Sequence, residues 1–275
     1  MTSTTGASHP LDQAVQLFAK SKGVYHGHTS AEYGNMVGPF GGATAAAVMQ
    51  ALLQHPDRLG EPLSLSLNFA GPIQTGSYVI TTQIIRTNRS TQHWLILLTQ
   101  DAETAVSATA ICAVRRPSWS SAEAVFPQVP AADQLERTSP VDWAAWTHRY
   151  DMRFVTEIAA ISDQTGEGRA NSLSQLWMRD EPPRALDFIS LTALCDAFYP
   201  RIFLRQAKQV PAGTVSMMIV FHADAAALAL QGEKSVLGVA QALHFGLSFF
   251  DQAAQIWGSH GILLASSHQV VYFKA

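Results

Sequence analysis

One carboxylate, Asp196, lies in a stretch of the chain that is otherwise almost entirely apolar. The segment from Leu186 to Phe203 predicts a helix that is apolar nearly all the way round and therefore lies inside the protein. An aspartate is rarely buried without a partner, and burial raises the pKa of its carboxyl group. Pro200 is expected to end the helix, which places Asp196 in or near the last turn, where the helix dipole disfavours a negative charge. A carboxylate in so unfavourable a position is a candidate for acid–base chemistry.

Other reactive side chains are weaker candidates. The segment YHGHT contains His26 and His28 but no nearby acid or cysteine cluster, so it is interpreted as a loop rather than a metal site. Ser259 in WGSHG lacks the G-x-S-x-G spacing of a nucleophilic serine and is expected in a turn between strands. The segment GEGRAN lacks the third glycine of a dinucleotide-binding loop. Cys112 and Cys195 are isolated in apolar segments and are expected to be free, buried thiols.

The composition is that of a globular protein with ample material for a core. The chain has 275 residues, of which 47% are hydrophobic and 14% charged, and its formal net charge is -3. This length suggests one large domain or two modest ones. No block of like charges indicates binding to nucleic acid or to an anionic membrane surface. The N-terminal segment lacks the pattern of a signal peptide and no apolar run reaches the ~18 residues of a membrane span, so a cytoplasmic protein is expected.

The two halves of the chain are alike in pattern. Each contains a helical apolar segment followed by a β-rich run: GGATAAAVMQALL precedes the first run, and ALDFISLTALCDAFYPRIF precedes the second. We expect a meander of antiparallel strands to cover each helix, because so apolar a helix must be buried against a sheet. The strands are predicted at residues 63–69, 78–87, 94–101 and 106–115 in the first half and at 214–222, 235–243, 246–253 and 261–273 in the second.

Between the halves, residues 117–147 contain four prolines and show no clear period, which indicates a linker. Its aromatic content indicates that the linker is docked on the surface. The tryptophans concerned are Trp119, Trp143 and Trp146. We therefore expect a first domain at residues 1–116, the linker, and a second domain at residues 148–275 that contains the polar site.

Six short segments, taken in order, resemble the acyl-CoA thioesterase II (TesB-like) family, whose members have a double hot dog fold. The segments are GPFGGATAAAVMQALL, FAGPIQTG, QLWMRD, LCDAFYP, GTVSMMIVFH and LLASSHQVVYFK, and the likeness covers nearly the whole chain outside the linker. The resemblance implies an α+β fold with two hot dog domains in tandem, each a long apolar helix wrapped by an antiparallel sheet. Family members carry an aspartate, a threonine or serine, and a glutamine that position and activate a water against a thioester carbonyl. These match Asp196, Thr214 and Gln269.

The chemistry of a thioester suits these three residues. Its carbonyl is electrophilic enough for direct attack by water, which requires a base, groups that orient the water, and donors for the developing oxyanion. Asp196 can accept the proton, while Thr214 and Gln269 can orient the water and the carboxylate through neutral hydrogen bonds. Some family members also have a histidine in the strand that is LSLSLNF here. Its absence argues against a role for a first-half histidine.

The internal repeat offers a check on this assignment. Matching FAGP in the first half to FHAD in the second gives an offset of 152 residues, which sets Thr214 opposite Pro62. Matching AVSATAI to LLASSHQ sets Gln269 against Ile111. The first-half helix contains no acid. The three polar residues therefore exist only in the second copy, as expected if one site survived a duplication.

Further candidate residues concern the substrate. Gly41 and Gly42 open the first-half helix, where unpaired N–H groups could bind an oxyanion, and close packing or a tight turn is the alternative. Phe198, Tyr199 and Phe203 are expected to line an apolar tunnel for an acyl chain. The basic groups that could contact the phosphates of CoA, or simply be solvated, are Arg86, Arg89, Arg201, Arg205 and Lys208.

We therefore expect an acyl-CoA thioesterase that hydrolyses acyl-CoA to free acid and CoA without a cofactor or a metal. One alternative is a hydratase or dehydratase acting on acyl thioesters, although such sites usually pair an acid with a histidine and LTALCDAFYPRIF contains none. The other is a non-catalytic module that binds acyl thioesters. Acyl-CoA is the expected partner, nucleic acid is not, and a homo-oligomer is left open.

Overall fold

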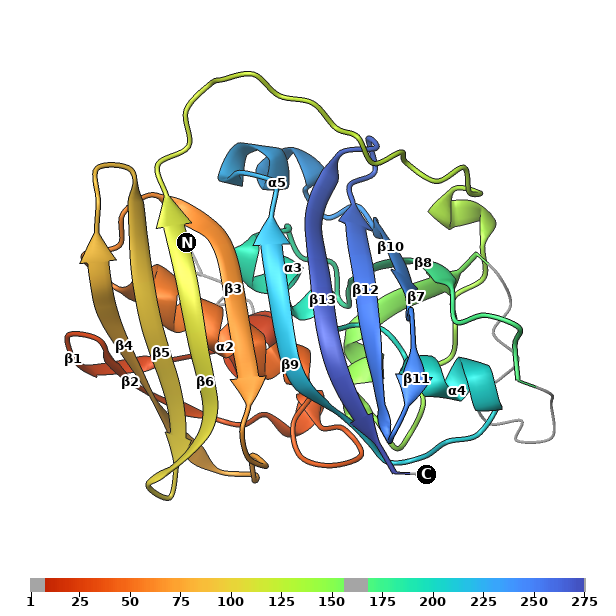
Figure 1. Ribbon diagram of the computed structural model, residues 1–275, viewed down its shortest axis with the longest axis horizontal. Helices are drawn as coiled ribbons and strands as arrows, with labels where there is room; N and C mark the ends of the chain where they lie inside the picture. Colours follow the sequence, from red (N-terminus) through yellow and green to blue (C-terminus); the bar gives the residue numbers. More distant parts are fainter. Residues whose placement is uncertain (1–7, 156–167, 275) are drawn as a thin grey trace, which may run out of the picture.

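One antiparallel sheet, with helices packed behind it in the view of Figure 1, makes up the protein. The computed structural model describes residues 8–155 and 168–274. Within these residues the α-helices are α1 (Pro10–Ala14), α2 (Gly41–Gln54), α3 (Phe188–Leu194), α4 (Arg201–Gln206) and α5 (Ala225–Gln231), and short 3₁₀ turns cover Ala31–Tyr33, Ala132–Gln134 and Ala145–Arg149. The strands are β1 (Phe18–Ser21), β2 (Val24–His28), β3 (Glu61–Phe69), β4 (Ser77–Thr87), β5 (Thr91–Gln100), β6 (Glu103–Ala113), β7 (Tyr150–Phe154), β8 (Ser174–Asp180), β9 (Ala212–Phe221), β10 (Val236–Gln241), β11 (Phe245–Gly246), β12 (Phe249–Trp257) and β13 (Leu263–Phe273).

The strand order reveals two copies of one unit. Along the sheet the order is β1-β2-β4-β5-β6-β3 and then β9-β13-β12-β10-β8-β7, so the two halves mirror each other about the β3–β9 junction. At this junction the halves pair antiparallel, from Ser64 opposite Val220 to Asn68 opposite Ser216. Each copy contains a hairpin, an apolar helix and four further strands along the sheet, and the second copy adds α4, α5 and the short β11. The predicted double hot dog architecture, with the two sheets joined edge to edge, is confirmed.

The hairpin that precedes each helix was not predicted. Strands β1, β2 and β7 have only four or five residues, too few for a clear period, and all four positions of β1 are exposed. The prediction of a loop at YHGHT is therefore wrong, because these residues belong mainly to β2. In this strand Tyr25 and Gly27 face inward, while His26 and His28 are exposed.

Helix α2 is buried because of its composition. Its sequence, GGATAAAVMQALLQ, is rich in alanine, the strongest helix former, and contains no charged residue. Its small residues allow α3 to approach closely. A Cβ atom at Gly42 would lie only 2.6 Å from the carbonyl oxygen of Ala193 on α3. The first-half and second-half helices therefore pack directly on each other as well as on the sheet.

The second apolar helix differs from the prediction. The segment 186–203 forms two helices, since α3 ends at Leu194 and α4 begins at Arg201, directly after Pro200. The sequence predicted a helix that ends at Pro200, but α3 already ends at Leu194, before Asp196. Asp196 consequently lies in the turn that follows α3, where the N–H of Phe198 donates to the Asp196 carbonyl at 2.7 Å.

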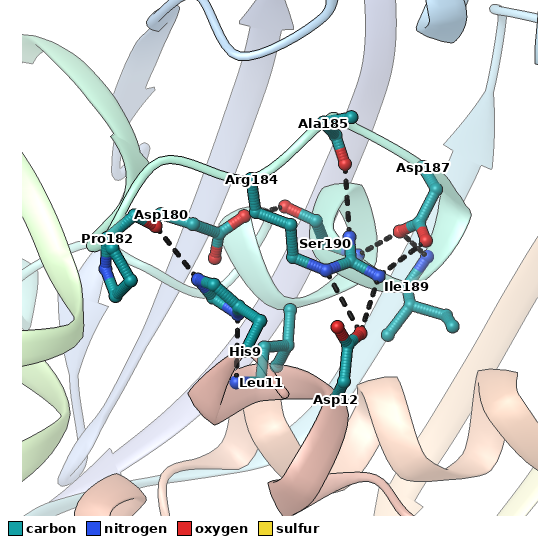
Figure 2. A network of polar contacts seen from close by, with 10 residues as sticks. All are labelled: His9, Leu11, Asp12, Asp180, Pro182, Arg184, Ala185, Asp187, Ile189 and Ser190. Atoms are coloured by element: carbon teal, nitrogen blue, oxygen red, sulfur yellow. Dashed lines mark hydrogen bonds and ion pairs between the residues drawn. The ribbon is translucent and has the colours of Figure 1, made fainter. Parts of the chain in front are cut away.

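A polar network joins α1 of the first half to the start of α3 in the second half (Figure 2). Arg184 lies between two carboxylates, donating to Asp12 on α1 at 2.8 Å and to Asp187 at 2.7 Å. Asp187 is the N-cap of α3 and accepts hydrogen bonds from the N–H groups of Ile189 and Ser190. The network thus fixes the N-terminal end of α3 relative to the first half.

The linker runs over one end of the sheet, from the end of β6 to the second half (Figure 1). The prediction that its tryptophans are docked holds for two of the three. Trp146 is 3% exposed and stacks on Phe40 with ring centroids 4.5 Å apart, and Trp143 is partly buried. Trp119 is 88% exposed, so the first part of the linker is not docked through it.

Candidate active site

A cavity of about 470 Å³ opens where the N-terminus of α2 meets the turn after α3 and the strands of the second half. The predicted site residues that line it are Gly41, Asp196, Phe198, Tyr199, Thr214 and Gln269. Gly42 lies behind this wall, and Phe203 belongs instead to a separate apolar cluster with Ile202 and Val210. The tunnel lining predicted from Phe203 is therefore wrong, because this side chain packs behind Trp143, which itself lines the cavity.

Three polar side chains on the cavity wall form one hydrogen-bonded chain. Gln269, which faces inward on β13, donates from Nε2 to Oδ1 of Asp196 at 2.9 Å. Thr214 on β9 donates from its hydroxyl to Oε1 of Gln269 at 3.2 Å. The structure thus brings together residues that lie far apart in the sequence. Their catalytic roles stay a prediction.

The electrostatic surroundings of Asp196 have two opposing effects. Burial raises the pKa of its carboxyl group to about 7, while hydrogen bonds from Gln269 and from the backbone of Gly42 act to lower this pKa. The carboxylate also faces the N-terminus of α2, since a Cβ atom at Gly41 would lie 2.8 Å from Oδ2 of Asp196. The dipole at this end of a helix favours a negative charge. The sequence suggested that Asp196 lies isolated in an unfavourable position. In the structure, the N-terminus of α2 from the first half stabilises its charge.

The two glycines at the start of α2 are explained by close approach. Gly41 leaves room for the Asp196 carboxylate, and Gly42 leaves room for the backbone of α3 at Ala193. Because the backbone of Gly42 hydrogen-bonds to Asp196, that N–H group is already engaged. The packing alternative therefore accounts for Gly42 better than the oxyanion role.

The register of the strands corrects the comparison of the two copies by one residue. Pro62 pairs with Cys112 in the first copy, and Thr214 pairs with Val271 in the second. Both pairs lie beside a register shift, which supports the offset of 152 for Thr214 and Pro62. The equivalent of Gln269 is then Ala110 rather than Ile111. An error of one residue in this comparison matters, because it places the counterpart of Gln269 on the opposite face of its strand.

Some cavity residues were missed by sequence reasoning. Trp143 and Trp146 of the linker line the cavity, although their sequence indicated only docking. Gln252 on β12 also lines it and was not singled out. The available signal for Gln252 was an inward-facing polar residue in a strand whose neighbouring inward positions, Phe250 and Ala254, are apolar.

Arg201 is not available to bind phosphate. It is completely buried, and its guanidinium donates to the carbonyl oxygens of Tyr199, Ser172 and Ala240. Burial lowers its pKa to about 9. This arginine holds the segment that follows Asp196 against the sheet, so Arg201 is removed from the five candidates for contact with CoA phosphates.

Other sequence expectations concern cysteines, metals and membranes. Cys112 and Cys195 are free and buried, as predicted. Among residues 8–155 and 168–274, no group of three or more histidine, cysteine, aspartate or glutamate side chains is placed to hold a metal ion. None of the helices in the described part of the chain is long and apolar enough to cross a membrane.

Two family models match the sequence. Residues 30–113 match the acyl-CoA thioesterase N-terminal domain, and residues 126–273, more than half of the chain, match the acyl-CoA thioesterase C-terminal domain. Among proteins with curated descriptions, none matches the chain.

Solved structures give a consistent result. A conserved hot dog protein of unknown function from Alicyclobacillus acidocaldarius is 41% identical, with a TM-score of 0.92 and coverage of 98% of this chain and 99% of that one. An acyl-CoA thioesterase II from Mycobacterium marinum is 16% identical, with a TM-score of 0.77 and coverage of 96% and 98%. At this low identity the second likeness is evidence for the fold alone.

Proposed function

The chain belongs to the acyl-CoA thioesterase family, and we propose that it hydrolyses acyl-CoA thioesters to a free acid and CoA by direct attack of water. The observation that carries this proposal is the Asp196 carboxylate on the cavity wall, hydrogen-bonded to Gln269, which in turn accepts from Thr214. A carboxylate with a pKa near neutrality is suited to act as a general base at that pH.

The reaction proceeds in two steps. In the first, the water oxygen bonds to the thioester carbon, its proton passes to Asp196, and the π electrons of the carbonyl move to its oxygen. In the second, the oxyanion collapses, the C–S bond breaks with its electron pair on sulfur, and Asp196 returns the proton to the thiolate. The products are the carboxylic acid and CoA, and no covalent bond to the protein is formed.

The walls of the cavity suit an acyl thioester. Phe198, Tyr199 and Ile73 supply apolar surface for the acyl chain, and Trp143 and Trp146 add aromatic surface from the linker. Within the described residues no histidine lines the cavity. This weighs against a hydratase whose site pairs an acid with a histidine.

A free-thiol assay with a panel of acyl-CoAs tests the proposal. We expect the parent protein to release CoA and Asp196→Asn to lower kcat by about a hundredfold to ten-thousandfold while the fold is retained, because the base is lost. Thr214→Val and Gln269→Ala should each lose less, and their losses should not add to that of Asp196→Asn, because all three act on one water. If Asp196→Asn retained the parental rate, the aspartate would be a structural residue and the mechanism would be wrong.

A further inference from the structure

Gln252 is a largely buried glutamine that lines the cavity, and its side-chain amide forms no hydrogen bond with residues 8–155 or 168–274. Its side chain, 4% exposed, lies on the inner face of β12 and lines the same cavity as Asp196. A buried amide is costly unless it is hydrogen-bonded. A polar residue kept at such a position is therefore a candidate for contact with a substrate.

Gln252 is a direct neighbour of the polar chain. It pairs with Gln269 across the antiparallel β12–β13 ladder. Directly opposite residues of such a pair point to the same face of the sheet, with Cβ atoms about 4.5–5.5 Å apart. The amide of Gln252 is thus held beside that of Gln269, close to where a water oriented by Asp196 would attack.

The comparison of the two copies singles out the same residue. In the second copy Gln252 pairs with Gln269, and in the first copy Trp94 pairs with Ala110. Ala110 is equivalent to Gln269 by register, so Trp94 is equivalent to Gln252. Trp94 is a fully buried core residue. The second copy has thus replaced an apolar core residue by an amide at the position next to Gln269.

Three of the donors around Asp196 are already engaged. The Gln269 amide donates to Asp196, the Thr214 hydroxyl donates to Gln269, and the backbone of Gly42 hydrogen-bonds to Asp196. The reaction nevertheless requires a donor for the oxygen on which negative charge develops. Gln252 has two amide protons and no competing acceptor among the described residues.

We propose that Gln252 is a catalytic residue that donates a hydrogen bond from its side-chain amide to the thioester carbonyl oxygen and stabilises the oxyanion formed when water attacks. This inference rests on the proposed function. In the first step the carbonyl π electrons move to oxygen, and the hydrogen bond from Nε2 strengthens with the charge. When the C–S bond breaks, the electrons return to form the carbonyl of the acid. The glutamine neither gains nor loses a proton.

The test compares two variants on the same strand. Gln252→Met keeps the length of the side chain and removes its donor. Gln255→Met makes the same change on the other face of β12, where Gln255 accepts from Trp257 and does not line the cavity. For both, kcat and KM are measured with an acyl-CoA that the parent hydrolyses. Equilibrium binding is measured with the corresponding S-alkyl-CoA thioether, which has no carbonyl oxygen.

We expect Gln252→Met to lower kcat by about a hundredfold to a thousandfold, the usual loss when one oxyanion donor is removed. KM and thioether binding should change little, and Gln255→Met should behave like the parent. If Gln252→Met fails to fold, Gln252→Glu keeps the shape of the side chain. It should show the same loss of kcat above neutral pH, because an ionised carboxylate donates no hydrogen bond.

Three outcomes would overturn the inference. An unchanged kcat would exclude a role in the oxyanion. A rise in KM matched by weaker thioether binding, with kcat retained, would mean that Gln252 holds another part of the substrate. A parent protein that releases no CoA from any acyl-CoA would overturn the proposed function and this inference together, whereas the first two outcomes leave the proposed function intact.

Discussion

Asp196 is placed between two helix ends of opposite polarity. It follows the C-terminus of α3, which disfavours its charge, but its carboxylate faces the N-terminus of α2, which favours it. Burial is the strongest influence and raises its pKa to about 7, and hydrogen bonds from Gln269 and Gly42 limit the rise. The carboxylate is thus nearly as basic as it can be while still being substantially ionised at neutral pH, which is where a general base works best.

This balance predicts a pH dependence. Asp196 must be ionised to accept a proton, so a pKa raised to about 7 means that kcat/KM should rise with pH through about 7 and then level off. Gln269→Met removes a hydrogen bond that lowers this pKa, so its profile should have a midpoint at higher pH as well as a smaller amplitude. Profiles measured on both sides of neutrality check this. A profile without this rise, or a midpoint that Gln269→Met leaves unmoved, would contradict the role of Asp196 as the base.

At the scale of the elements, the sequence was most informative where a pattern is long. The strands from β3 to β6 run for nine or more residues, and all four were predicted to within three residues at each end. The short hairpin strands have too few residues to show a period. The apolar segment around Asp196 was predicted to be helical as far as Pro200, and its composition alone did not reveal that α3 ends at Leu194.

The candidate site was predictable only in part, for a related reason. The trio was found by resemblance, and its chemistry could be argued from residue types. The approach of the α2 N-terminus to Asp196 could not be found in this way. It is a contact between the two halves, made by Gly42 and Asp196, which lie 154 residues apart in the sequence. Gln252 has only a weak local signal, a polar residue between the apolar inward positions Phe250 and Ala254. Its pairing with Gln269 and its counterpart Trp94 are seen only in the sheet.

The start of α2 offers a matched pair of substitutions. Gly41→Ala would place a Cβ atom 2.8 Å from Oδ2 of Asp196, so the carboxylate must shift and kcat should fall at least tenfold with little change in stability. Gly42→Ala would place a Cβ atom 2.6 Å from the Ala193 carbonyl, so α2 and α3 must separate, which should cost about 1–3 kcal/mol of the free energy of unfolding. Urea denaturation and the free-thiol assay on both variants check this. Similar effects of the two changes on activity and stability would contradict the division of roles.

The linker offers a second matched pair. Trp143 lines the cavity and packs against Phe203, whereas Trp119 is almost fully exposed. Trp143→Ala should enlarge the cavity and change the ratio of kcat/KM between long and short acyl-CoAs by about tenfold, a typical effect of altering an apolar pocket by one or two methylene groups. Trp119→Ala should leave this ratio at the parental value. An unchanged ratio in Trp143→Ala would mean that the linker covers the cavity without contacting the acyl chain.

At the scale of the whole molecule, the cavity belongs to neither half alone. Asp196, Thr214, Gln252 and Gln269 come from the second half, whereas Gly41, Phe40 and Phe69 come from the first. The halves share one continuous sheet through β3 and β9, and Arg184 ties α1 to α3. The first half lacks equivalents of Asp196, Thr214 and Gln269, but it is still required. It provides the N-terminus of α2 and part of the apolar wall of the cavity.

This shared construction predicts that the two halves unfold together. Leu65 is fully buried on β3, opposite Ile219 of β9, and Leu65→Ala should cost about 2–5 kcal/mol of stability through the lost packing. Hydrogen exchange, followed peptide by peptide, should give the slowest amides of β5 and β12 the same free energy of opening. Leu65→Ala should lower both values equally, although β12 lies wholly in the other half, and Ile85→Ala, at an exposed position of β4, should lower neither. Loss of protection confined to β5 would mean that the halves are separate folding units joined only at their edges.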